Sequence, residues 1–338
     1  MKKILLLTIP VLLVFCQCKT TREKAIIMTV NGPVSAETMG SWLTHEHILV
    51  DFIGADSISN DRWEKPEVIK KAVPYLQQIK DLGCQTFVEC TPAFLGRDPL
   101  LLKSLSDSTG LNVITNTGLY GARNNKFIPG YAFEETAEQL AKRWTTEWEE
   151  GIDGTGIKPG FIKIGVDNGN LSEMHKKLIT AAAITHLKTG LVIASHTGPA
   201  IPAFEQIEIL KQEGVSPEAF IWVHAQSEKD MANHIKAAQS GAWISLDGLG
   251  DNNLQDYLAM INNLKDNNLL NRILLSHDAG WYDPGKENGG EYRGYTTLFE
   301  KLIPLLRNEN YSEKEIDLLL VINPAQAFTI KIRKATQK

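Results

Sequence analysis

The sequence predicts a single α/β domain, a (β/α)8 TIM barrel with terminal helices and a site at the carboxyl ends of its strands. Three observations favour this fold. After residue 40, eight short apolar runs alternate with longer segments of helical pattern. No Pro/Gly/Ser-rich linker interrupts the series. No strand is followed by G-x-G-x-x-G, which leaves an open doubly wound sheet as the second choice.

Each expected strand is a short apolar run that ends at turn-forming or polar residues. In chain order the runs are SWLTHEH (41–47), QTFVEC (85–90), NVITNTG (112–118), GFIKIG (160–165), LVIASH (191–196), AFIWVH (219–224), AWISLD (242–247) and RILLSHD (272–278). Amphipathic segments such as 66–83, 133–151 and 172–190 provide the helical crossovers that parallel strands need. The stretch 312–330 predicts a pair of terminal helices.

The first residues have the pattern of an export signal. MKK gives a positive start, and ILLLTIPVLLVF is an apolar run too short to span a bilayer comfortably. We therefore expect residues 1–18 to be a signal peptide and residues 19–338 to form the folded domain. The signal ends in FCQCKT, so a bacterial lipoprotein lipidated at Cys16 or Cys18 and a plain cleaved signal both remain open. We expect a periplasmic protein or one anchored to the outer membrane.

Charge and cysteine content exclude other classes. A formal net charge of −5 and the absence of a basic stretch argue against nucleic-acid binding. The cysteines of the expected domain, Cys84 and Cys90, lie on one strand about 20 Å apart, beyond the roughly 7 Å limit for a disulfide. We expect two unpaired, mostly buried thiols.

The placement of the eight histidines indicates a metal site. His45 and His47 close the first strand and point to the same side, because side chains on a strand alternate. His196 and His224 close the fifth and sixth strands, and Asp278, preceded by His277, closes the eighth. A lone histidine at a strand end is more often a hydrogen-bonded core residue. Several histidines that lie together with a carboxylate at one end of the barrel are suited to bind Zn²⁺ or a related divalent ion.

Other histidines and one lysine complete the pattern. The histidines in helical stretches are expected to be surface or packing residues: His175, His186 and His234. Lys163 interrupts the apolar strand GFIKIG, and a buried ammonium is costly unless it is paired or neutralised. The residues alone would favour a lysine that extends out of the strand end to water.

These motifs together resemble the phosphotriesterase family of the amidohydrolase superfamily. The resemblance covers about residues 26–330 and is carried by THEHI (44–48), GFIKIG, SHTG (195–198), WVH (222–224) and SHD (276–278). FLGRDPLLLKSLSDSTGLNVITNTGLY (94–120) and the closing NPAQAF (323–328) also match. The resemblance implies a barrel that holds two divalent metals.

The resemblance also implies a ligand set. The more buried metal would take His45, His47 and Asp278, and the more exposed one His196 and His224. Lys163, carboxylated by CO₂, would bridge both together with a hydroxide, the nucleophile. Asp278 would accept the proton. Zn²⁺ is the expected metal, with Mn²⁺, Co²⁺ or Fe²⁺ as alternatives.

The sequence departs from the family at substrate-related positions. Organophosphate hydrolases of the family carry a proton relay of an aspartate and a histidine where this chain has Ser227 and Gly248. Lactonases usually carry an arginine at the position of Gly248, and this is missing too. Tyr120 remains where lactonases keep a tyrosine against the bound ring, although it could equally be a packing residue at the barrel rim.

Two further regions bear on the substrate. Arg97, in GRDP, is expected to be structural. The long loop 279–295 is expected to carry specificity, with Trp281 as a pocket wall and Arg293 as a contact for an anionic group, although plain loop packing is at least as well supported.

The expected function is hydrolysis of a small lactone or carboxylic ester at two metals. The alternatives are an organophosphate or phosphate ester hydrolase, a hydrolase of C–N bonds, and a non-catalytic binding lipoprotein. No nucleic acid is expected as a partner, the only membrane contact would be a lipid anchor, and the family resemblance allows a homodimer.

Overall fold

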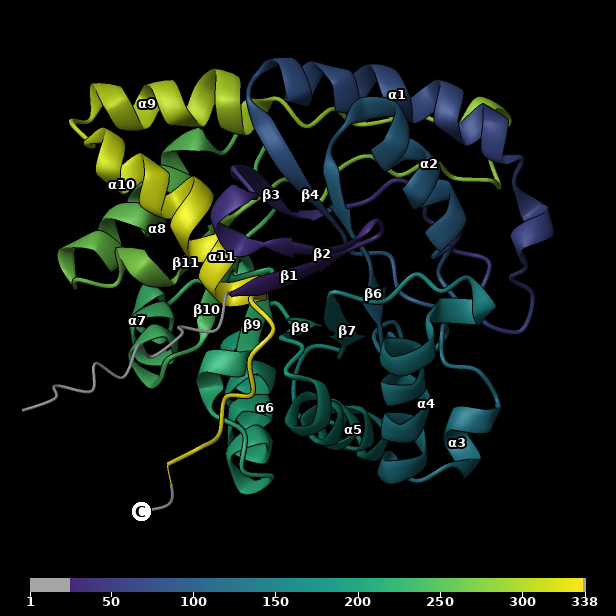
Figure 1. The fold of residues 1–338 in the computed structure, drawn as a ribbon. Helices are drawn as coiled ribbons and strands as arrows, with labels where there is room; N and C mark the ends of the chain where they lie inside the picture. The colour runs from purple at the N-terminus through teal and green to yellow at the C-terminus, as the bar shows by residue number, and fades with distance from the viewer. Residues whose placement is uncertain (1–24, 337–338) are drawn as a thin grey trace, which may run out of the picture.

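The computed structural model describes residues 25–336. The expected signal segment, with Cys16 and Cys18, lies outside the described residues. Eight parallel strands form a barrel surrounded by helices, so the predicted fold class is confirmed (Figure 1). None of the helices formed by the described residues combines the length and apolar character needed to cross a membrane.

The barrel strands agree with the sequence expectation to within a few residues. They are β3 (Ser41–Glu46), β4 (Cys84–Glu89), β5 (Asn112–Ile114), β6 (Asn116–Thr117), β7 (Phe161–Gly165), β8 (Ile193–His196), β9 (Phe220–Val223), β10 (Trp243–Leu246) and β11 (Ile273–Leu275). The expected third strand is divided at Thr115: β5 pairs with β4, and β6 pairs with β7. From β6 to β11 each strand pairs in parallel with the next along the chain.

Hydrogen bonds between the first and last strands close the barrel. The amide of Asp278 donates to the carbonyl of His45 (3.1 Å), and that of His47 donates to Ala279 (2.9 Å). Both bonds lie at the carboxyl ends of β3 and β11, so closure itself brings together residues that are far apart in sequence.

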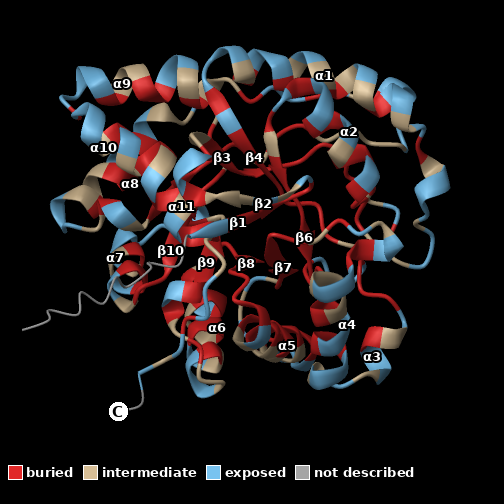
Figure 2. Cartoon of the chain, viewed as in Figure 1, coloured by how far each residue is buried: buried red, intermediate tan, exposed pale blue. Residues whose placement is uncertain are grey.

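Helices cover the outside of the barrel. They are α1 (Lys65–Asp81), α2 (Pro99–Thr109), α3 (Tyr131–Glu134), α4 (Ala137–Glu150), α5 (Glu173–Thr189), α6 (Ala200–Gln212), α7 (Met231–Ser240), α8 (Leu254–Asp266), α9 (Ile303–Asn308), α10 (Glu313–Asp317) and α11 (Asn323–Phe328). Their inward faces are buried and their outward faces exposed (Figure 2). The expected helix 133–151 is split into α3 and α4, because Thr136 starts a new helix with a capping box to Gln139.

The amino-terminal end of the barrel is closed by elements that the strand pattern did not predict. A hairpin of β1 (Ile26–Thr29) and β2 (Gly32–Ser35) precedes the barrel. Ile27 of this hairpin belongs to the same apolar cluster as Trp42 and Phe161 inside the barrel. Phe328 of α11 stacks on Trp42 at 5.6 Å, so the two chain ends cover one end of the barrel and leave the other for the site.

The expected pair of terminal helices is a nearly continuous helical stretch. A π-helical turn, Leu318–Ile322, joins α10 to α11. Asn323 at the start of α11 donates to the carbonyls of Leu270 and Ile273 (both 2.9 Å), which fixes the stretch to β11.

Candidate metal centre

The expected ligands lie at the carboxyl end of the barrel around one cavity of about 460 Å³. They come from β3, β7 and β8 and from the residues that follow β3, β9 and β11. All six line this cavity: His45, His47, Lys163, His196, His224 and Asp278.

Several potential ligand atoms are close enough to share an ion. One nitrogen or oxygen each of His45, His224 and Asp278 lies within 4.8 Å of the others, the only such group in residues 25–336. Nε2 of His47 is 3.0 Å from Oδ1 of Asp278, and the rings of His196 and His224 have centroids 4.4 Å apart. The structure therefore brings together residues that span most of the chain.

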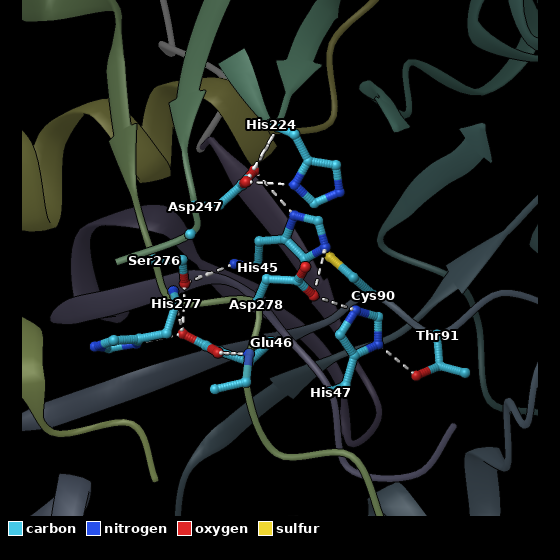
Figure 3. Close-up of polar contacts among 12 residues, drawn as sticks. His45, Glu46, His47, Cys90, Thr91, His224, Asp247, Ser276, His277 and Asp278 are labelled. Atoms are coloured by element: carbon cyan, nitrogen blue, oxygen red, sulfur yellow. Dashed lines mark hydrogen bonds and ion pairs between the residues drawn. The ribbon is translucent and has the colours of Figure 1, made fainter. Parts of the chain in front are cut away.

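Two of these residues have an unusual backbone conformation. His224 and Asp278 have φ values of 61° and 53°, in the left-handed region that non-glycine residues rarely adopt. His224 directly follows β9, Asp278 is the third residue after β11, and both turn their side chains toward the cluster (Figure 3). Strained backbone of this kind is concentrated at functional sites, which agrees with a role for both side chains.

Asp247 orients two of the histidines and was not identified from the sequence. Its carboxylate is fully buried and accepts from Nδ1 of His45 (3.0 Å) and Nδ1 of His224 (2.7 Å), as Figure 3 shows. A proton held at Nδ1 leaves Nε2 of each ring free to bind a metal. The signal was present in SLDG, where a carboxylate closes the seventh strand.

His47 is oriented in a similar way by residues after β4. Its Nδ1 lies 2.7 Å from Oγ1 of Thr91, which in turn contacts the buried carboxylate of Glu89. Burial, opposed by the charge of His47 and several hydrogen bonds, leaves the pKa of Glu89 raised.

Lys163 is buried without an anionic partner. Its side chain is only 2% exposed, its Nζ lies 3.3 Å from Nε2 of His45, and no carboxylate of residues 25–336 forms an ion pair with it. An isolated buried ammonium is strongly unfavourable, whereas a carboxylated lysine beside metal ions would be neutralised. The site therefore fits the metal pair and the modified lysine that the family resemblance implies.

The pKa shifts of His45, His196 and Asp278 suit metal binding. Burial, together with the charge of Lys163, lowers the pKa of His45 to about 4, and burial beside His224 lowers that of His196. Burial alone would lower the pKa of His224, but Asp247 raises it. Burial opposes ionisation of Asp278, yet its contact with His47 and the neighbouring imidazoles hold its pKa below the ordinary value. Neutral imidazoles and an ionised carboxylate are the forms that bind metals.

His277 and Glu46 do not face the cavity. Glu46 alternates with the two histidines of THEHI and points to the other side of β3, where it accepts from Nδ1 of His277 (2.7 Å) and from the amide of Ala279 (2.9 Å). Figure 3 shows the His277 ring directed away from the cluster. This pair fastens β11 to β3 and supports the site from behind.

The remaining histidines and the cysteines are packing residues. His175, His186 and His234 are all buried, so the surface alternative is excluded for them. Cys84 and Cys90 are free and buried, as expected, although Cys90 also lines the cavity.

Of the expected substrate contacts, two line the cavity and one does not. Tyr120 lies against His196, with ring centroids 5.1 Å apart, and Trp281 lies 6.0 Å from His47. Gly165 makes room for Tyr120, since a Cβ there would be 2.8 Å from its ring. Arg293 is outside the lining, and its guanidinium donates to the carbonyl of Asp278 (3.0 Å), so its position does not support a substrate contact.

Arg97 is a structural residue, as expected. It is buried, forms a bidentate ion pair with Glu147 (2.7 and 2.9 Å) and donates to the carbonyl of Asn116 (2.8 Å). This ties α4 to the barrel wall outside the candidate metal centre.

Of the two positions that depart from the family, Ser227 lines the cavity, and Gly248 lies behind Gln226, which lines it. Ser227 is exposed at its mouth. The space beside Gly248 is filled by Gln226, whose Nε2 would be 2.6 Å from a Cβ at position 248. Gln226 donates to Oδ1 of Asp247 (3.2 Å) and accepts from the Asp247 amide (3.1 Å), so it fixes the carboxylate that orients His45 and His224.

Comparisons with known proteins identify relatives of this chain. The chain is 31% identical over 302 residues to the phosphotriesterase homology protein of Escherichia coli, covering 87% of this chain and all of that one. It is 27% identical to an aryldialkylphosphatase of Saccharolobus solfataricus, covering 88% and 97%. A solved structure described as organophosphate hydrolysis activity engineered from a weak promiscuous lactonase template superposes with a TM-score of 0.81 at 25% identity, covering 90% and 99%.

Family membership follows from the extent of these matches. The sequence pattern of the Phosphotriesterase family matches residues 25–328, nearly the whole described domain. Enzymes of this family hydrolyse ester bonds and use a binuclear metal centre. The chain belongs to the Phosphotriesterase family, and it is a metal-dependent hydrolase of ester bonds.

Proposed function

We propose that the chain is a binuclear hydrolase, with Zn²⁺ as the metal, that opens a lactone or cleaves a carboxylic ester. The observation that carries the proposal is the convergence of the six expected ligands on one cavity. His45, His47 and Asp278 would hold one ion and His196 and His224 the other, with carboxylated Lys163 between them. Such ions would polarise the scissile carbonyl and lower the pKa of a bound water molecule towards about 7.

Asp278 is the residue suited to proton transfer. Its lowered pKa keeps it ionised at neutral pH, and its side chain is 23% exposed, so it reaches the cavity. It can accept a proton inside the site and release it to solvent. Nε2 of His47 lies 3.0 Å from Oδ1 of Asp278.

The cavity walls favour a compact substrate with an apolar part. Tyr120, Trp281, Val50 and Leu95 line it, and they can exclude water from a bound ring. Burial raises the pKa of Tyr120, so its hydroxyl stays protonated and can donate a hydrogen bond. This supports a lactone, although an aryl ester would meet the same walls.

Hydrolysis of phosphotriesters is the second candidate, favoured by the aryldialkylphosphatase relative. Against it stands the missing proton relay. Gln226 occupies the space that a side chain at position 248 would need, and Ser227 cannot carry a proton as a carboxylate can. The same site chemistry could also cleave an amide, which belongs in any substrate panel.

Metal analysis and a substrate panel test the proposal. Protein purified with zinc and bicarbonate should contain close to two ions per chain. It should hydrolyse lactones or aryl esters with a higher kcat/KM than paraoxon-like triesters and N-acyl amides. Well under one ion per chain, with no activity gained on adding zinc or manganese with bicarbonate, would refute the enzyme. A triester or an amide that exceeds every lactone and ester would refute the substrate class.

We also propose that the protein acts outside the cytoplasm, on the basis of residues 1–18. Mass spectrometry of the mature amino terminus would distinguish lipidation at Cys16, lipidation at Cys18 and simple cleavage. An intact Met1 in membrane-free cytosol would refute export.

A further inference from the structure

One positively charged side chain in the cavity does not belong to the expected set of metal ligands. The charged residues in the lining are Lys163, Asp278 and Arg123, and only Arg123 stands apart from the ligand set. Arg123 is exposed at the mouth, and its guanidinium forms neither an ion pair nor a side-chain hydrogen bond within residues 25–336. All its donors are therefore available to a bound molecule.

The backbone around Arg123 is held in a rare conformation. Arg123, Asn124 and Asn125 have consecutive φ values of 59°, 55° and 60°, all left-handed. Non-glycine residues avoid this region, and three in succession persist only when surrounding contacts impose it.

Those contacts come from the strand that carries Lys163. Asp167 follows β7, and its carboxylate accepts from the amides of Arg123 (2.6 Å) and Asn124 (3.1 Å). The position of the Arg123 backbone is thereby fixed relative to the candidate metal centre. A solvated surface arginine would need no such support.

An aromatic wall directs the side chain. The guanidinium carbon lies 4.9 Å from the ring centroid of Phe52, which packs against Trp281 at 5.7 Å. An arginine stacked on a ring keeps its planar donors free for a carboxylate or phosphate. Trp281 also lines the cavity, and its Nε1 is buried without a hydrogen-bond partner in the described chain.

We propose that the substrate is a small ester or lactone with an anionic group, a carboxylate or a phosphate, that pairs with Arg123. Its scissile bond would lie at the histidine cluster, and its apolar part against Tyr120 and Trp281. This inference rests on the proposed ester hydrolysis. It assigns to Arg123 the anion contact that the sequence suggested for Arg293, which does not line the cavity.

The test compares one lactone in three forms: with a carboxylate substituent, with that carboxylate as its neutral amide, and with a phosphomonoester. The wild-type enzyme should prefer one anionic form over the amide. Arg123→Gln should lower kcat/KM for that form on the order of 10- to 100-fold, mainly through KM, because a hydrogen bond to a charged group is lost. The kcat/KM for the neutral amide should fall by much less than that for the anionic form, and Arg123→Lys should restore part of the loss.

Arg143→Gln is the matched control. Arg143 is also exposed and lies over an aromatic ring, Tyr131, at 4.2 Å, but it lines a different cavity. Arg143→Gln should leave the preference for the anionic lactone over the neutral amide unchanged. The wild-type preference should also weaken as salt is raised, whereas Arg123→Gln should be insensitive to salt.

The outcomes separate this inference from the proposed function. If the neutral lactone is hydrolysed and Arg123→Gln leaves the anionic-to-neutral ratio unchanged, the ester hydrolase stands and the anion contact is wrong. If no form is hydrolysed, a binding measurement still tests the anion contact. Tryptophan fluorescence would report binding of the ring-opened carboxylate and phosphate products to metal-loaded protein. Binding weakened at least about 10-fold by Arg123→Gln supports the contact, and equal binding overturns it.

Discussion

Replacing Asp247 by asparagine should weaken one metal site more than the other. The carboxylate accepts from His45 through Oδ2 and from His224 through Oδ1. Asparagine has the same shape but only one acceptor oxygen, and its amide nitrogen cannot accept an N–H from either ring. The Oδ2 position also faces the hydroxyl of Ser245 (2.6 Å), which can accept from an amide nitrogen. We therefore expect the nitrogen at that position, opposite His45.

His45 then loses the partner that keeps its proton on Nδ1. The alternative tautomer carries the proton on Nε2, the atom expected to bind metal. Loss of such an orienting partner typically lowers metal affinity about 10- to 100-fold, equivalent to about 1.4 to 2.7 kcal/mol. The ion held by His45 and His47 should be lost first, while the ion held by His196 and His224 is retained longer.

The assay is metal content against chelator concentration, with thermal unfolding measured in parallel. Asp98→Asn is a matched control, because Asp98 is equally buried and caps α2 by accepting from the amide of Leu101 (3.0 Å), away from the cavity. It should lower stability and leave both metals in place. Chelator resistance of Asp247→Asn equal to that of the wild type would refute the tautomer argument.

Three further outcomes are expected. Lys163→Ala should fold with a wild-type circular dichroism spectrum but lose metal and activity; wild-type metal content would exclude a bridging role. Chelator-treated protein should lose stability in urea as the pH falls from about 6.5 towards 4. The pKa values of His45 and His196 are lowered in the folded state, so the unfolded chain binds more protons in this range. The raised pKa of His224 acts in the opposite direction, and we expect its effect to be smaller. A flat profile would contradict it. Burial raises the pKa of the Cys84 thiol to about 12, so a thiol reagent should react at pH 8 only after unfolding, and rapid reaction of the native protein would show that the barrel opens.

The barrel could be predicted because each strand carries its own local signal. Short apolar runs and helix-length spacers alternate regularly, and the predicted strand ends differ from the observed ones by only a few residues. The hairpin Ile26–Thr29 and Gly32–Ser35 escaped prediction because its burial comes from the barrel end and from Phe328, contacts that do not exist until the chain is folded.

The histidine and aspartate candidates could be proposed from the sequence because they lie at or just after strand ends, whereas the role of Lys163, in the middle of β7, rested on the family resemblance. Active sites of this fold lie at the carboxyl ends of the barrel strands. Folding of the barrel is enough to bring together His45, His196, His224 and Asp278, which lie at those ends. Arg123 had no such signal. It lies in a loop, and its access to the cavity depends on Asp167 and on a left-handed backbone that no sequence pattern indicated.

The departures from the family at Ser227 and Gly248 have a physical consequence that a residue-by-residue match does not reveal. In the sequence, Gly248 replaces a larger residue that relatives carry. In the structure, Gln226, which follows the neighbouring strand β9, fills that space. Gln226 contacts both the amide and the carboxylate of Asp247, which in turn contacts His45 and His224. The space beside Gly248 is thus taken by a residue that supports the expected metal ligands. Restoring a larger residue at position 248 would not simply restore a relay, because it would first displace Gln226 and loosen Asp247. A substitution at position 248 is therefore expected to affect metal binding, whereas a substitution of Arg123, on another loop, is expected to leave both ions in place.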